Sequence, residues 1–191
     1  MDQLISKLFN KQPRFEIKWR IIAPIIILCI ISLILLKSTS NDSTLIASTF
    51  NRQLIWLLLG TVVFICIQFI RTQFFYEYAY LLYAVLILSI IATYFMPEIG
   101  GSRRWIILGS ISMQPSELGK LIMVFVLAKF LADQRDNFNH VLVYLVTIML
   151  AVIPAILIFK QPDLGTAFIY LAITYPMLYW SGVRPYYLFI F

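Results

Sequence analysis

Charged residues are scarce in this sequence. Only 13% of its 191 residues are Asp, Glu, Lys or Arg, whereas 61% are hydrophobic, and the mean hydropathy is +0.88. A soluble domain of this size exposes too much surface to hide so apolar a composition. The composition therefore excludes an ordinary soluble protein and predicts an all-α fold, a polytopic transmembrane helical bundle.

Residues that bind metals or form disulfides are also scarce. The sequence has a single histidine, His140, and two cysteines, Cys29 and Cys66, which both lie inside apolar runs. Buried cysteines of this kind usually act as small hydrophobic residues, so we expect no disulfide between them. Without a Cys/His cluster a metal site has no support, and no cofactor motif is evident.

Positive charge is concentrated at the N-terminus. The formal net charge is +6, and five of the fifteen Lys and Arg lie in the first twenty residues: Lys7, Lys11, Arg14, Lys18 and Arg20. This placement indicates a basic cytoplasmic tail, residues 1–19, under the positive-inside rule, and gives no reason to expect nucleic-acid binding. A short amphipathic segment on the anionic inner leaflet is the alternative for the same residues.

Apolar runs divide the remainder of the chain into membrane spans. Six complete spans are predicted, at about 20–37, 54–70, 78–95, 115–131, 141–159 and 164–181. The last residues begin a seventh apolar run that is too short to cross a bilayer. We therefore expect residues 20–191 to be the N-terminal part of a single membrane domain, from a longer protein or a truncated gene product.

Alternation of these spans, starting from a cytoplasmic N-terminus, places three loops outside the membrane: 38–53, 96–114 and 160–163. The Lys/Arg distribution favours this orientation, but Arg103 and Arg104 oppose it. Cations on the disfavoured side indicate that an anion binds there, and a guanidinium group matches phosphate well. An interfacial anchor formed with Trp105 is the alternative. The run Trp105–Leu108 is too short to span a bilayer, so we expect it to lie in the interface or to re-enter.

A Glu–Lys pair follows this polar loop at the start of the fourth span. Glu117 and Lys120 are three residues apart, hence on one helix face, and Pro115 suits the first helical position. Glu117 then occupies the third position, from which its carboxylate can cap the helix start. A capped helix with a local ion pair is one interpretation. The other is a polar cavity, because a lysine one turn into a membrane helix is costly elsewhere.

A second acidic residue precedes the sixth span. Asp163 follows Pro162 at the position of an N-cap. The small side chains after it allow neighbouring helices to approach closely: Gly165, Thr166 and Ala167. Such an approach is expected to bring Asp163 near the helical turn that carries Glu117.

These segments resemble the SEDS family (shape, elongation, division and sporulation) of bacterial membrane proteins. The stretches GSRRWIILGSISMQPSELGK and FKQPDLGTA are similar to a family pattern that reads about G-x-x-R-W-x-x-L-G, then Q-P-S-E-x-x-K, then P-D-x-G-T. The matching residues are Gly101, Arg104, Trp105, Leu108, Gly109, Gln114, Pro115, Ser116, Glu117, Lys120, Pro162, Asp163, Gly165 and Thr166. The QPDLGTA form and the stretch Arg52–Trp56 resemble the elongation branch more than the division branch.

The resemblance implies a peptidoglycan glycosyltransferase of the bacterial inner membrane, which polymerises lipid II into glycan strands beside a class B penicillin-binding protein, a transpeptidase. It implies about ten spans and a catalytic aspartate in a later outer loop that this sequence does not contain. On this reading Arg104 and Lys120 face the pyrophosphate, Glu117 holds Lys120, and Asp163 positions a second cavity helix. Arg103, Gln114 and Ser116 complete the expected substrate contacts.

Two other classes of function remain open from the residues alone. Polar pairs in broken membrane helices also suit a transporter or flippase of the lipid-linked precursor. A non-catalytic membrane scaffold of a cell-wall synthase is the second alternative.

Overall fold

The computed structural model describes residues 19–39, 44–108, 111–134 and 141–182. The basic tail up to residue 18, His140 and the start of the seventh apolar run lie outside these residues. The chain divides into two compact units, one ending at Phe74 and one starting at Phe75, and each is described by itself. That residues 20–191 form a single membrane domain stays a prediction.

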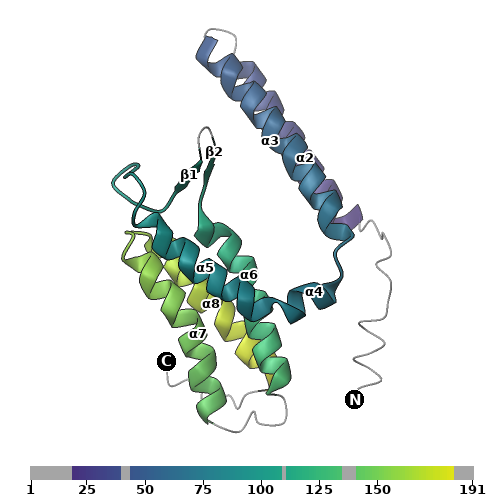
Figure 1. The fold of residues 1–191 in the computed structure, drawn as a ribbon. Coiled ribbons are helices and arrows are strands. Elements are labelled where there is room, and N and C mark those ends of the chain that lie inside the picture. Colours follow the sequence, from purple (N-terminus) through teal and green to yellow (C-terminus); the bar gives the residue numbers. More distant parts are fainter. Residues whose placement is uncertain (1–18, 40–43, 109–110, 135–140, 183–191) are drawn as a thin grey trace. The chain divides into compact units, whose positions relative to one another are not determined.

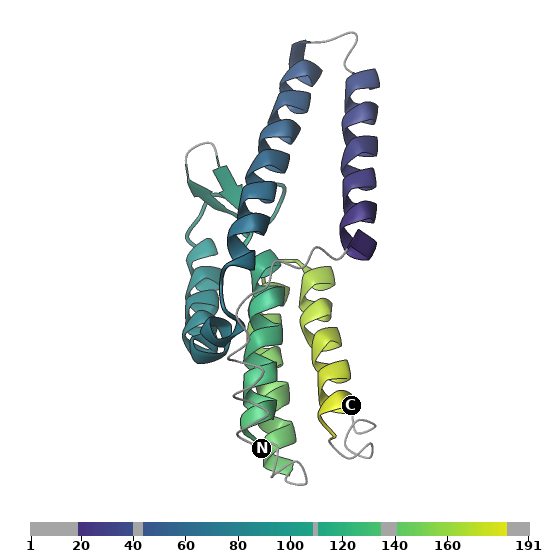
Figure 2. The same ribbon diagram turned by 90° about the vertical axis from the view of Figure 1, so that its right-hand side faces the viewer.

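The first unit is a pair of long helices that pack against each other, α2 (Trp19–Thr39) and α3 (Thr44–Gln68), as Figures 1 and 2 show. Most of the large apolar side chains whose burial is described along both helices are exposed. The loop expected over 38–53 is wrong from Thr44 onward, because α3 begins there, and α2 extends to Thr39. Ser, Thr and Asn favour helix starts as well as loops, and no Gly or Pro interrupts this segment before Gly60.

The second unit is a bundle of four helices, preceded by the short helix α4 (Thr72–Glu77). Its members are α5 (Ala79–Thr93), α6 (Pro115–Asp133), α7 (Val141–Phe159) and α8 (Leu164–Ser181). Helix α6 contacts the other three, and α7 packs along α8 (Figure 1). The core between them includes Leu86, Met123, Leu127, Ile158 and Tyr170, all at most 1% exposed.

The expected polytopic helical architecture is confirmed. Each of the six predicted spans coincides with a helix, apart from the early start of α3. Among the described residues, three segments are long and apolar enough to cross a membrane: Trp19–Ser38, Thr49–Gln68 and Val141–Phe159. Ala79–Thr93 is apolar but shorter. Helix α6 is more polar than these because it carries Glu117, Lys120, Lys129 and Asp133.

The polar loop between α5 and α6 forms a β-hairpin, which the sequence did not predict. Strand β1 (Ile106–Leu108) pairs antiparallel with β2 (Ile111–Met113), with Ile106 opposite Met113. Ahead of it, Ile99 and Ser102 exchange backbone hydrogen bonds around Gly100 and Gly101. Their φ angles of 59° and 76° are those of a type I′ turn, which glycine adopts without strain.

The opposite end of α6 is tied to α4 and α5 by polar contacts. Lys129 Nζ lies 4.9 Å from the ring centre of Tyr76 and 4.8 Å from that of Tyr80, and it donates to the Glu77 carbonyl at 3.3 Å. The Tyr76 hydroxyl donates to the Asp133 carboxylate. That hydrogen bond, with burial and the nearby charge, raises the pKa of Tyr76 to about 12.

Candidate functional site

The centre of the candidate site is the carboxylate of Asp163. Asp163 is the N-cap of α8, as the sequence predicted: one oxygen accepts the Thr166 N–H at 3.1 Å. Its other oxygen, Oδ2, accepts the Thr166 hydroxyl at 3.0 Å. These two bonds fix the carboxylate at the end of the helix and satisfy donors that the first turn would otherwise leave open.

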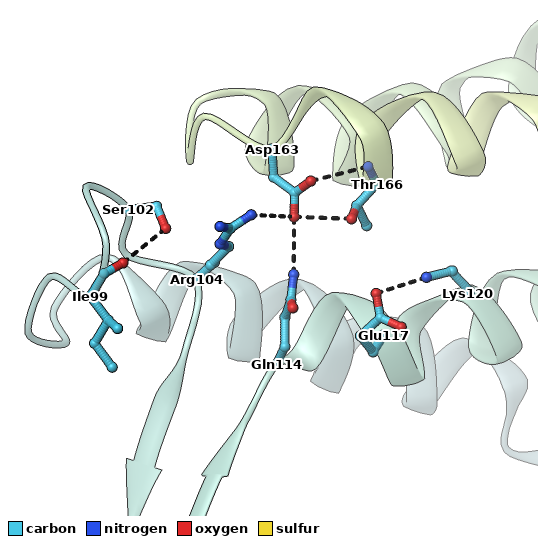
Figure 3. A network of polar contacts seen from close by, with 8 residues as sticks. All are labelled: Ile99, Ser102, Arg104, Gln114, Glu117, Lys120, Asp163 and Thr166. Atoms are coloured by element: carbon cyan, nitrogen blue, oxygen red, sulfur yellow. Dashed lines mark hydrogen bonds and ion pairs between the residues drawn. The ribbon is translucent and has the colours of Figure 1, made fainter. Parts of the chain in front are cut away.

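Two further side chains converge on the same oxygen from distant parts of the chain. Gln114 Nε2 donates to Asp163 Oδ2 at 3.0 Å, and Arg104 Nη1 lies 3.4 Å from it (Figure 3). Gln114 is the N-cap residue of α6, and Arg104 lies just before β1. The cluster thus joins three structural elements through one carboxylate, and Asp163 as a whole is only 9% exposed.

The electrostatics of this cluster keep Asp163 ionised. Burial alone would raise the pKa of its carboxyl, but the hydrogen bonds from Thr166 and the Arg104 guanidinium outweigh burial and hold the pKa below its usual value. Arg104 Nε is buried and has no hydrogen-bond partner among the described residues. Its side chain as a whole is 34% exposed, so Arg104 is not fully enclosed by the protein.

Glu117 and Lys120 form a second ion pair, with 2.7 Å between Oε1 and Nζ. Glu117 occupies the third position of α6, as expected, but its carboxylate pairs with Lys120 rather than capping the helix start. The carboxylate side chain is 55% exposed and that of the lysine 25%. Glu117 and Lys120 lie near the start of α6, and Asp163 lies at the start of α8 (Figure 3). Within the described residues, no hydrogen bond or ion pair joins the Glu117–Lys120 pair to Asp163.

Arg103 and Ser116 take part in neither the Arg104–Asp163 nor the Glu117–Lys120 ion pair. Arg103 is 3.9 Å from Glu98 and donates to the Tyr94 carbonyl at 3.5 Å, with more than half of its side chain exposed. Ser116 is 2% exposed; its carbonyl accepts the Tyr170 hydroxyl at 3.0 Å, and its own hydroxyl has no partner among the described residues. Substrate contacts by either residue therefore stay predictions.

Gln161 is a site residue to which sequence reasoning gave no role. It is 3% exposed, and its Nε2 donates to the Ile90 carbonyl at 3.1 Å and to the Thr93 hydroxyl at 2.7 Å. These bonds fasten the segment before Asp163 to the end of α5. The one available signal was the repeat of Gln-Pro ahead of an acid, in QPSE and QPDL, which indicates no partner.

The arrangement suits the binding of an anion rather than a metal. Among the residues that the structure describes, no three His, Cys, Asp or Glu side chains lie close enough to hold a metal ion. Two cations, Arg104 and Lys120, are instead each held by a carboxylate at the same end of the bundle. Guanidinium and ammonium groups that are fixed in this way can bind phosphate oxygens through charge-assisted hydrogen bonds.

Comparison with known proteins gives consistent matches. A family model described as "Cell cycle protein" (FtsW, RodA, SpoVE) matches residues 15–191. The probable peptidoglycan glycosyltransferase FtsW of Nitrosococcus halophilus is 32% identical over 70% of this chain and 35% of its own length. The peptidoglycan glycosyltransferase RodA of Treponema pallidum is 26% identical over 76% of this chain and 34% of its own.

Two solved structures also match this chain. The crystal structure of the rod shape determining protein RodA of Thermus thermophilus matches with a TM-score of 0.76 and 27% identity, over 91% of this chain and 56% of that one. A chain of a peptidoglycan synthase complex matches with a TM-score of 0.71 and 26% identity, over 86% and 49%. The chain spans about a third of the length of the two curated relatives. A match over nearly the whole sequence and a shared helical fold show that the chain belongs to the FtsW/RodA/SpoVE family, the SEDS proteins.

Proposed function

We propose that this chain carries the precursor-binding part of a peptidoglycan glycan-strand polymerase that acts in cell elongation. The observation that supports this most directly is the cluster at Asp163, where Arg104 and Gln114 meet it from separate elements. In a family whose relatives are named peptidoglycan glycosyltransferases, a fixed and partly exposed guanidinium suits a lipid-linked pyrophosphate.

The chemistry of strand growth gives these residues their roles. A sugar hydroxyl gives its proton to a general base and attacks the anomeric carbon of lipid II, and the bond to the pyrophosphate breaks, so negative charge develops on the leaving group. Arg104 and Lys120 are assigned to that charge, and Asp163 and Glu117 hold them in place. Gln114 orients Asp163. Asp163 itself is a poor candidate for the general base, because its pKa is lowered and its oxygens are already hydrogen-bonded.

Lipid II binding by the purified chain in nanodiscs tests this proposal. We expect saturable binding of fluorescent lipid II, weakened about 10- to 100-fold in Arg104→Gln, which is the equivalent of one charged hydrogen bond. Lys37→Gln, a cation of the first unit, is the charge-matched control and should bind like the wild type. Equal binding by all three proteins would remove Arg104 from the site.

A chimera tests the reaction itself. Residues 15–191 would replace the matching segment of Thermus thermophilus RodA, and glycan strands made from labelled lipid II would be resolved on gels with a class B transpeptidase present. We expect strands from the chimera and none from its Lys120→Ala variant. Movement of lipid II across vesicles without strands would favour the transporter alternative.

The proposed location is the bacterial cytoplasmic membrane, with a cytoplasmic N-terminus and the Asp163 cluster on the outer side. The Lys/Arg bias of the sequence supports this orientation. In a variant without native cysteines, an impermeant thiol reagent should label a cysteine at Glu98 and spare one at Ala132. The reverse pattern would contradict the proposed orientation. A transpeptidase partner is proposed because a structural relative belongs to a complex described as coordinating polymerization and crosslinking.

A further inference from the structure

A wholly apolar groove lies between α7 and α8. Its cavity of about 380 Å³ is lined by four residues of each helix, and none of the eight is polar. The hollow exists because two of its lining residues, Ala155 and Ala167, are buried and have small side chains. The larger side chains beside them are exposed: Ile156, Phe159 and Phe168. The volume lies within the range of about 300–1,000 Å³ that is typical of ligand pockets.

The groove runs along the helix axes and starts at a loop. Phe159 and Leu164, on either side of the loop between α7 and α8, line one end of it, and Val152 and Leu171 line the other. Seven residues of helix correspond to a length of about 10 Å at the usual rise. The shape therefore suits a linear hydrocarbon chain lying parallel to α7, one of the helices apolar enough to cross a membrane.

An unpaired cation stands at the loop end of this groove. Lys160 directly follows Phe159 and is exposed. Within the described part of the second unit, the other cations each have a partner. Arg103 lies near Glu98, Arg104 near Asp163 and Lys120 near Glu117, while Lys129 contacts the Glu77 carbonyl and two tyrosine rings. Lys160 has neither an ion pair nor a side-chain hydrogen bond among those residues, so its ammonium is available to a ligand.

From these features we infer that the groove binds an anionic phospholipid, with one acyl chain between α7 and α8 and the phosphate on Lys160. Hydrocarbon fills such a groove because an empty one forfeits dispersion contacts along its whole lining. A single lysine at the interface favours an anionic headgroup over a zwitterionic one by about fivefold, which corresponds to ~1 kcal/mol. Neither Lys160 nor the residues that line the groove take part in the Asp163 or Glu117 ion pairs, so the inference does not rest on the proposed precursor site.

Native mass spectrometry of the delipidated chain tests the inference, with phosphatidylglycerol and phosphatidylcholine of identical acyl chains as probes. We expect phosphatidylglycerol to bind about fivefold more tightly to the wild type. Lys160→Gln should abolish that preference, and Lys160→Arg should keep it. Ile156→Trp at the exposed rim should weaken both lipids tenfold or more, the loss of about two buried methylenes. Leu145→Trp, an equally exposed position of α7 outside the groove, is the matched control.

Three results would overturn the inference. Equal affinity for the two lipids in the wild type would remove the headgroup contact. If Ile156→Trp left lipid binding unchanged, the groove could not be the lipid-binding site. Displacement of phosphatidylglycerol by a tenfold lower concentration of undecaprenyl phosphate would identify the groove as a polyprenyl site instead. The variants lie on an exposed loop and an exposed rim, so folding of the core does not limit the test.

Discussion

Replacement of Gly119 by alanine is the sharpest test of how α6, α8 and α5 pack. A Cβ at this position would lie closer to the Tyr170 hydroxyl than real contacts allow, 2.5 Å from Leu86 Cδ1 and 3.1 Å from Leu86 Cδ2. Neither neighbour moves easily, because both side chains are fully buried and the Tyr170 hydroxyl is bonded to the Ser116 carbonyl. The substitution therefore forces the helices apart or breaks that hydrogen bond.

The expected cost follows from these contacts. Overpacking a filled core costs about 1–3 kcal/mol, and a buried hydroxyl left without its partner costs a further ~1–3 kcal/mol. The higher helix propensity of alanine stabilises the folded state by about 1 kcal/mol relative to glycine and offsets part of this cost. Gly119→Ala should therefore lower the free energy of unfolding by about 1–5 kcal/mol.

Unfolding of the purified protein in mixed micelles with increasing SDS measures this change. Gly165→Ala is the control, since a Cβ there meets nothing within 4 Å in the same unit. Adding Tyr170→Phe to Gly119→Ala should recover part of the loss by removing the closest atom, while the Leu86 contact remains. Equal stability of the Gly119 and Gly165 variants would refute the packing argument.

Three other predictions concern the polar groups. Asp163→Asn should be less stable than the wild type at pH 7. In thermal unfolding this difference in stability should disappear below about pH 4, because a carboxylate with a lowered pKa no longer stabilises the fold once it is protonated. A difference that stays constant with pH would contradict this. Gln161→Leu should cost about 1–3 kcal/mol through its two lost hydrogen bonds, one of them to Thr93, and an unchanged melting temperature would exclude that role. Glu117→Gln and Lys120→Met should each change the free energy of unfolding by under ~1 kcal/mol, since this carboxylate is half exposed, whereas a loss of several kcal/mol would reveal a desolvated pair.

The sequence predicted the parts of this fold that depend on local composition. Long apolar runs located the helices, and the position of Asp163 after Pro162 and before an apolar run predicted its N-cap. The early start of α3 was missed because Ser and Thr serve loops and helix starts alike. The hairpin from Ile106 to Met113 was missed because three-residue strands give no periodic signal beside membrane spans.

The candidate site depends on long-range contacts, which is why only its residue types were predictable. Arg104 was expected to face a ligand, and the structure adds Asp163 as its partner. Gln161 reaches Thr93 and Ile90 at a separation of about 70 residues, and no pattern in the sequence encodes that contact. The motif residues were visible, but their pairing required the arrangement of the helices.

The Asp163 cluster also has a consequence for synthesis. Gln114 leaves the ribosome 49 residues before Asp163, and Arg104 earlier still. At about 5–20 residues per second, that interval is roughly 2–10 s. During this interval the β-hairpin and the start of α6 lack the Asp163 carboxylate that later fixes them. The site is therefore complete only after α8 has been synthesised. Substitution of Asp163 would therefore appear first as a defect in membrane assembly, seen as degradation of the newly made chain.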